Sequence, residues 1–247
     1  MLFVRICGLL LMAVPSPVMA AAPAAAATQN AAVREDALEL ARLLNPGDLL
    51  IGLAARSFDE AFDKGMAAEG GSETLEKEFP GLIADLRQTI RDATLADLKA
   101  DMPALHRRYA SFFGASFTPD EVAQLLVFYR SQTGTKIIKA KFASLDVSKL
   151  SDRFAEDPDA KLSAGDVKDL NQGAMPGVWN DMSADDIKAL MAFGLNPVAK
   201  KLKAVAPQMA EIEAEIANEP DPALDAAIEA ATRKVYERHG LDAPAGD

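Results

Sequence analysis

The chain has 247 residues, of which 49% are hydrophobic and only 6% aromatic, and its formal net charge is −11 at pH 7. This length suits one or two domains of ordinary size, and the recurring Ala, Leu, Lys, Glu and Asp favour helices over strands. An acidic surface repels phosphate groups, so nucleic acid and anionic lipid surfaces are excluded as main partners.

Residues 1–20 have the pattern of a secretory signal peptide, with one positive charge, Arg5, before an apolar stretch that ends in small residues. Prolines interrupt that stretch too early for a retained membrane anchor. The only cysteine, Cys7, lies in this segment, so the mature protein would hold no thiol for a disulfide, a metal site or a nucleophile. We expect a periplasmic protein with no stable membrane insertion and a flexible Ala-rich leader at 21–32.

Helical periodicity then predicts an all-α bundle of about eight or nine helices over residues 33–240, followed by a frayed tail at 241–247. A division of this domain into two halves, 33–150 and 160–240, is the alternative. Both interpretations follow from the same succession of amphipathic stretches and helix-breaking residues.

Glycine and proline mark the expected helix boundaries. A first helix ends at Pro46-Gly47, and Gly70-Gly71 separates a second helix from a long third one. Pro103 is expected to kink or restart that long helix, and Gly240 is expected to end the last one.

Residues 117–122 contain the elements of a helix start. Thr118 is the expected cap, Pro119 takes the first helical position, and Glu121 follows three residues after the cap. Phe117 and Val122 would pack across this start as a hydrophobic staple. The apolar face of the helix is predicted to consist of Val122, Leu125, Leu126 and Tyr129.

The same design recurs 65 residues later, so the helical hairpin at 117–150 is partly repeated at 182–217. The positions that pair without gaps include Asp120 with Asp185, Leu125 with Leu190, Phe128 with Phe193, and Lys136 with Lys201. A shorter echo begins at Leu162 and is expected to end at Gly173. Capped amphipathic helices resemble one another by physics alone, so common origin and coincidence both remain interpretations of this pattern.

The helix start at 117–121 is followed by the string Phe128-Tyr129-Arg130-Ser131-Gln132-Thr133-Gly134-Thr135-Lys136. Together they resemble the bacterial exported family called domain of unknown function 2059, whose pattern is a capped helix, Phe-Tyr, Ser, Thr-Gly, a variable residue and Lys. The resemblance covers residues 98–143, with a degenerate second copy at 182–204. It implies a helical fold and a periplasmic setting, and it implies no activity.

The candidate interaction motif is the polar turn of this pattern, which consists of Arg130, Ser131, Thr133, Gly134 and Lys136. An anion site at this turn is one interpretation, because a glycine, hydroxyl groups and a lysine meet at a helix start. The interpretation that we favour is a helix–helix connection in which Gly134 supplies a positive φ and Ser131 or Thr133 caps the next helix.

The sequence offers no catalytic, cofactor or metal site. Its two histidines, His106 and His239, lack the spacing of metal ligands, and we expect His106 to be a partly buried or surface residue. The basic runs are expected to be solvated faces, and they comprise Lys136, Lys139, Lys141, Lys200, Lys201 and Lys203.

The absence of a chemical motif, combined with an extended helical repeat, favours a scaffolding or protein–protein interaction role with an unidentified envelope protein over an enzyme. The alternative is a carrier for a small apolar ligand or lipid, since helices rich in Leu, Met and Phe can enclose a pocket.

Overall fold

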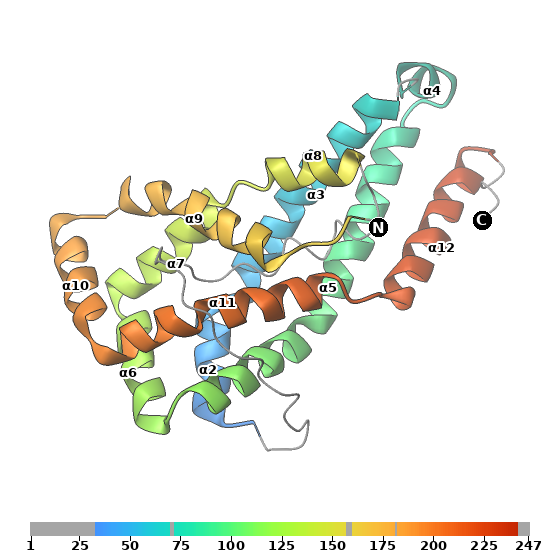
Figure 1. Ribbon diagram of the computed structural model, residues 1–247. Coiled ribbons are helices and arrows are strands. Elements are labelled where there is room, and N and C mark those ends of the chain that lie inside the picture. Colours follow the sequence, from blue (N-terminus) through green and yellow to red (C-terminus); the bar gives the residue numbers. More distant parts are fainter. Residues whose placement is uncertain (1–32, 70–71, 157–159, 181, 242–247) are drawn as a thin grey trace.

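A computed structural model of the chain describes residues 33–69, 72–156, 160–180 and 182–241 (Figure 1). The expected signal peptide and leader, the Gly70-Gly71 break and the tail beyond residue 241 lie outside the described residues. Within the described residues there are eleven helices and no strand, which confirms the all-α prediction.

The helices are α2 (Glu35–Leu44), α3 (Gly47–Glu69), α4 (Ser72–Glu78), α5 (Leu82–Ser116), α6 (Pro119–Arg130), α7 (Gln132–Ser144), α8 (Ser148–Glu156), α9 (Ala164–Asn180), α10 (Ala184–Leu195), α11 (Pro197–Ala217) and α12 (Pro222–Arg238). The sequence pattern did not predict the short helices α4 and α8. Both are too short to repeat an apolar stripe over several turns, so periodicity could not distinguish them from loops.

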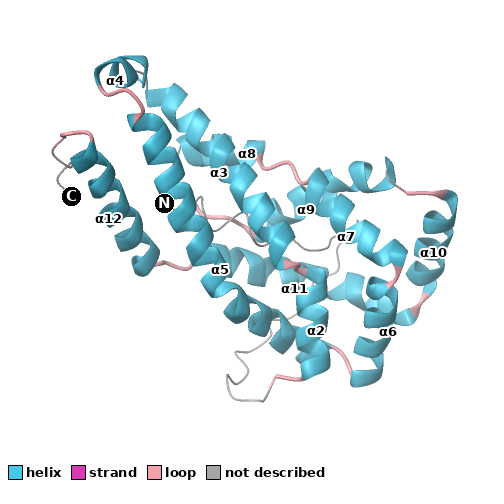
Figure 2. Cartoon of the chain, turned by 180° about the vertical axis from the view of Figure 1, so that it is seen from behind, coloured by secondary structure: helices cyan, strands magenta, loops and turns pink. Residues whose placement is uncertain are grey.

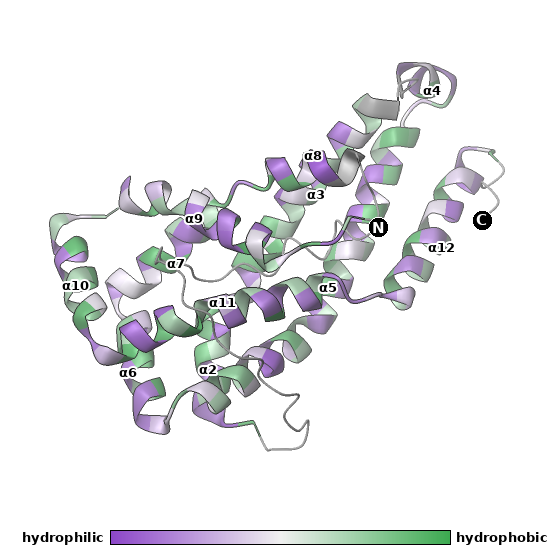
Figure 3. Cartoon of the chain, in the orientation of Figure 1, coloured by the Kyte–Doolittle hydropathy of each residue, from purple (hydrophilic) through white to green (hydrophobic). Residues whose placement is uncertain are grey.

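Helix α5 is the central element, and it packs against α2, α3 and α12. Helices α6, α7, α9 and α11 pack on one another beside this group. Helix α10 packs against α7 and α11. Figure 1 and the reverse view in Figure 2 place α4 and α10 at opposite ends of the molecule. Figure 3 shows hydrophobic and hydrophilic residues alternating around the helices, as the amphipathic pattern requires.

One continuous core joins the two proposed halves. It includes Leu40 from α2, Phe113 from α5 and Leu125 from α6, each 0% exposed, together with Met209 from α11. A shared core of this kind makes the helices before and after residues 157–159 depend on one another for burial. The domain boundaries themselves stay a prediction.

Of the two outcomes expected at Pro103, a kink or a restart, the restart is wrong, because α5 runs unbroken from Leu82 to Ser116. Figure 1 shows the helix bending in its middle, as an internal proline favours. The helix end expected at Gly173 is also wrong. Helix α9 does not end at Gly173 but continues to Asn180, because its buried face extends to Ala174 and Val178. Gly240 does follow the end of α12, with a φ of 72°.

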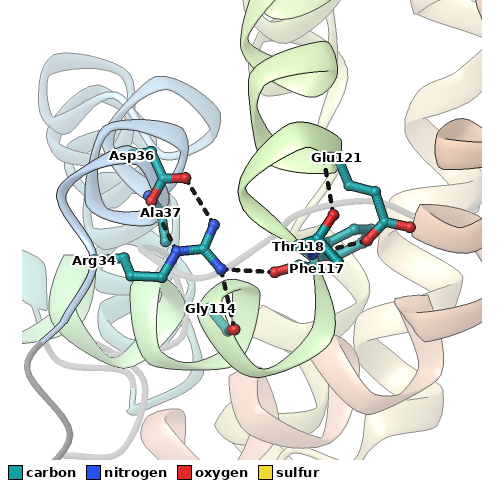
Figure 4. Close-up of polar contacts among 7 residues, drawn as sticks. All are labelled: Arg34, Asp36, Ala37, Gly114, Phe117, Thr118 and Glu121. Atoms are coloured by element: carbon teal, nitrogen blue, oxygen red, sulfur yellow. Dashed lines mark hydrogen bonds and ion pairs between the residues drawn. The ribbon is translucent and has the colours of Figure 1, made fainter.

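An arginine at the start of α2 fixes the junction between α5 and α6, as Figure 4 shows. The Nη1 of Arg34 donates to the carbonyl of Phe117 at 2.7 Å and to that of Gly114 at 3.4 Å. Asp36 accepts from the same guanidinium group, and this hydrogen bond lowers the pKa of the Asp36 carboxyl. The contact pairs carbonyls that the end of a helix leaves without an intrahelical donor.

Within the described part of the chain, no helix combines the length and the apolar composition that a membrane span requires.

Candidate functional site

The predicted start of α6 is confirmed in detail. Glu121 N–H donates to the hydroxyl of Thr118 at 3.3 Å, and Thr118 N–H donates to the Glu121 carboxylate at 2.8 Å, which forms a complete capping box. Phe117 and Val122 are both buried on either side of it. The entry angle of α6, and with it the direction of the following turn, is therefore fixed locally.

Ser131 caps the next helix, α7. It is one of the two residues, Ser131 and Thr133, that the sequence proposed for this role. Its Oγ accepts from Gly134 N–H at 3.1 Å at the first turn of α7. The expected positive φ at Gly134 is wrong, because this residue has helical backbone and the positive-φ glycines of the described chain are Gly81 and Gly240. Gly134 is needed for a close approach instead. A Cβ there would lie 2.6 Å from Tyr129 Cα.

The other motif residues contact distant parts of the same chain. Arg130 Nε donates to Glu39 of α2 at 2.9 Å. Thr133 Oγ1 and Lys136 Nζ both donate to the Asp186 carboxylate, at 2.8 and 2.6 Å, so Thr133 does not serve as the cap. The Lys136 hydrogen bond, followed by those from Ser183 and Thr133, holds the pKa of the Asp186 carboxyl well below its usual range.

Asp186 belongs to the second hairpin and binds a lysine of the first. The second hairpin in turn supplies a lysine to an acid of the first. Lys201 Nζ donates to Glu121 at 2.6 Å. Lys201 and Asp186 are the residues that the 65-residue offset aligns with Lys136 and Glu121. Each hairpin therefore supplies one lysine and one acid to the other.

Each hairpin also has a phenylalanine whose sequence position falls between its acid and its lysine. Phe128 and Phe193, which the same offset aligns, stack with ring centroids 3.7 Å apart and an interplanar angle of 1°. Helices α6 and α10 each have 12 residues and a capping box, and each shares its final cap residue, Ser131 or Asn196, with the next helix. Such reciprocal contacts are those of an isologous interface formed within one chain. The common origin of the two hairpins stays a prediction.

Residues 103–146 match the family model described as "Uncharacterized protein conserved in bacteria (DUF2059)". This confirms the resemblance. The DUF2059 segment, defined as these residues, comprises the C-terminal part of α5 from Pro103 onward together with α6, α7 and the turn between them. Comparisons with curated proteins and with solved structures gave no match.

A cavity of about 490 Å³ lies between the DUF2059 segment and the helices that follow it. Its walls come from α6, α7, α9, α10 and α11, with Leu44 of α2 also contributing, and most of its lining is apolar. The residues that line it include Phe128, Ile137, Ile138 and Phe142 of the DUF2059 segment, Met175, Val178 and Trp179 of α9, and Leu190, Met191, Phe193 and Leu202 of the second hairpin.

Helix α10 forms a loosely packed cover over this cavity. The second hairpin was predicted to share the design of the first, but Asp186 is the only buried residue of α10, whereas α6 buries four apolar residues. Leu190 and Phe193 line the cavity and are only partly buried. Met191 on α10 and Trp179 on α9 are 65% and 45% exposed, which places them at the mouth of the cavity.

Lys141 is the residue that contradicts the expectation of solvated basic faces. Its side chain lines the cavity, it is only 8% exposed, and its Nζ has no hydrogen-bond partner among the described residues. Burial lowers the pKa of the Lys141 amine to about 7, although the charge of Glu213 opposes this shift. Asn171 lines the same cavity, and its Oδ1 also lacks a partner within the described chain.

Helical periodicity could have found these two polar residues. Lys141 lies three residues after Ile138 and four after Ile137, which places it on the apolar face of α7. Asn171 lies four residues after Val167, on the buried face of α9. A polar residue at a position of the apolar face of a helix indicates burial more strongly than its membership of a basic run indicates exposure.

The remaining candidates have structural roles. His106 is buried, more deeply than the partly buried or surface position expected for it; its Nε2 lies 2.8 Å from the carbonyl oxygen of Asn45, and burial lowers the pKa of its imidazole. Asp97, Asp101 and Asp221 bring carboxylate oxygens within 4.8 Å of one another at the junction of α5 and α12. Acidic groups of this kind also occur without a bound ion, so they do not indicate a metal site.

Proposed function

We propose that this protein binds a small apolar ligand in the cavity under α10, the second of the two roles that the sequence indicated. The observation that carries the proposal is the cavity of about 490 Å³, which lies within the size range of small-molecule sites and has a predominantly apolar lining. Its cover, α10, exposes apolar side chains instead of burying them in the core, as a helix that moves to admit a ligand would.

The scaffolding role is placed second because of what the motif residues contact. Arg130 binds Glu39, while Thr133 and Lys136 bind Asp186. These contacts within the chain account for the polar side chains of the turn without an envelope partner. A further partner at this turn stays a prediction of the sequence.

The proposal includes export to the periplasm, which the N-terminal pattern supports. We expect protein recovered from the periplasm to begin at Ala21 or within a few residues of it. N-terminal sequencing or intact-mass measurement checks this expectation. A chain that still begins at Met1 after recovery from that compartment would contradict it.

Filling the cavity tests the binding function directly. Ala199 lines the cavity on α11, so Ala199→Phe should reduce the affinity for a long-chain alcohol such as decanol by about tenfold or more, because the ring occupies space that the ligand needs. Isothermal titration calorimetry measures the affinity. For the wild type, decanol at about 100 times its Kd should also stabilise the fold by roughly 2.7 kcal/mol.

The matched control is Ala204→Phe, at an exposed position of the same helix that does not line the cavity. This variant should bind decanol like the wild type. Equal losses in the two variants, or the absence of decanol binding by the wild type, would refute the proposed function.

A further inference from the structure

The charged residues that line the cavity are all basic, although the protein is strongly acidic. Lys141, Lys200 and Lys203 line the cavity, and none of the described residues that line it is acidic. The chain as a whole has 37 acidic residues and 26 lysines and arginines. A cluster of cations around an apolar cavity in such a chain is complementary to an anionic group on the ligand.

The interior of the cavity also contains polar atoms that the protein leaves unpaired. The Nζ of Lys141 and the Oδ1 of Asn171 lack hydrogen-bond partners among the described residues, and these two side chains are 8% and 2% exposed. Leaving a buried amine and a buried amide oxygen unpaired destabilises the fold. A ligand that supplies the missing partner for the amine relieves that cost when it binds.

We propose that the ligand is an amphipathic carboxylic acid with a single hydrocarbon chain, whose carboxylate accepts hydrogen bonds from Lys141 inside the cavity. The hydrocarbon chain then lies among the apolar residues of α7, α9 and α10, and it extends toward Trp179 and Met191 at the mouth. This inference rests on the proposed function and adds the chemical class of the ligand to it.

The charged and titratable groups near Lys141 leave its amine available. Glu213 of α11 is fully buried and accepts a hydrogen bond from the Tyr109 hydroxyl of α5 at 3.3 Å, but no hydrogen bond joins its carboxylate to Lys141 Nζ. On α3, Arg56 donates to the backbone carbonyl of Phe142 at 2.8 Å. Lys200 and Lys203 of α11 add positive charge at the cavity wall.

The protonation state of Lys141 gives the binding of an acid a characteristic pH dependence. The pKa of this amine is about 7 in the free protein, and pairing with a carboxylate favours the charged ammonium form. Above about pH 7 the amine must take up one proton from solution when the carboxylate binds. Affinity for the acid should therefore fall as pH rises beyond 7, by up to about tenfold per pH unit.

The test compares decanoic acid with decanol, each kept below the concentration at which it forms micelles or separates. We expect the wild type to prefer decanoate at pH 6, and Lys141→Met to reduce decanoate affinity by about tenfold or more while decanol affinity stays within about twofold. Because methionine suits an apolar site, the variant should also melt at a higher temperature than the wild type. The pH profile of the wild type provides the same test without a substitution.

The outcomes separate this inference from the proposed function. If neither ligand binds, the proposed function fails. If decanol binds as tightly as decanoate between pH 6 and 8.5, the cavity function holds and the carboxylate inference fails. A double variant, Lys200→Met with Lys203→Met, serves as the control for orientation. If it abolishes the preference for decanoate and Lys141→Met does not, the assignment of the carboxylate to Lys141 is refuted.

Discussion

Leu125→Ala should lower the free energy of unfolding by about 2 to 5 kcal/mol, the usual cost of removing a buried leucine side chain from a packed core. Leu125 is 0% exposed and belongs to the core between the motif helix α6 and its neighbours. Little space is available for relaxation, because α6 is fixed at its start by the capping box and packs against α2, α7 and α11. Urea unfolding followed by circular dichroism measures the change.

The matched control for this substitution lies two residues further along the same helix. Val127 is 72% exposed, so Val127→Ala should change stability by less than about 0.5 kcal/mol. Comparable losses for the two variants would mean that α6 does not pack in the orientation described.

Gly134→Ala should destabilise the protein by roughly 1 to 3 kcal/mol, even though alanine is the better helix former. An added Cβ would lie 2.6 Å from Tyr129 Cα and closer still to the carbonyl oxygen of Phe128. Both are backbone atoms of α6, so no side-chain rotation relieves the clash and the start of α7 must move away. Thermal unfolding and urea unfolding both measure the loss.

Gly114→Ala is the control, because Gly114 lies inside α5 with no atom within 4 Å of an added Cβ. This substitution should raise stability by about 0.5 to 1 kcal/mol through helix propensity alone. The two glycine substitutions therefore have opposite expected signs. A stabilising effect of Gly134→Ala would show that the close approach of α6 and α7 is not required.

The movement of α7 in Gly134→Ala also bears on the role of the DUF2059 motif. Displacing the start of α7 shifts Thr133 and Lys136 relative to Asp186, and so weakens the contact that holds the cover helix α10. The motif turn and the cavity are linked in this way. The glycine of the motif, Gly134, is therefore required for the close packing of α7 on α6. The lysine, Lys136, holds α10 in position through Asp186.

What the sequence determined was local. The cap at Thr118, the staple of Phe117 and Val122, and the boundary at Gly240 depend on residues within one or two helical turns, whose chemistry is readable from their spacing. The resemblance over the motif was also visible, because the motif is a continuous string. The match at 103–146 confirmed it.

What only the tertiary structure decided was the pairing of distant elements. The sequence aligned Lys136 with Lys201, but it gave no reason to place either lysine against the acid of the other hairpin, because side-chain pairs fifty or more residues apart leave no periodic signal. The same holds for Lys141. Its phase on α7 indicated a buried side, whereas the cavity beside it is formed by side chains from α6, α7, α9, α10 and α11, which only the tertiary structure brings together.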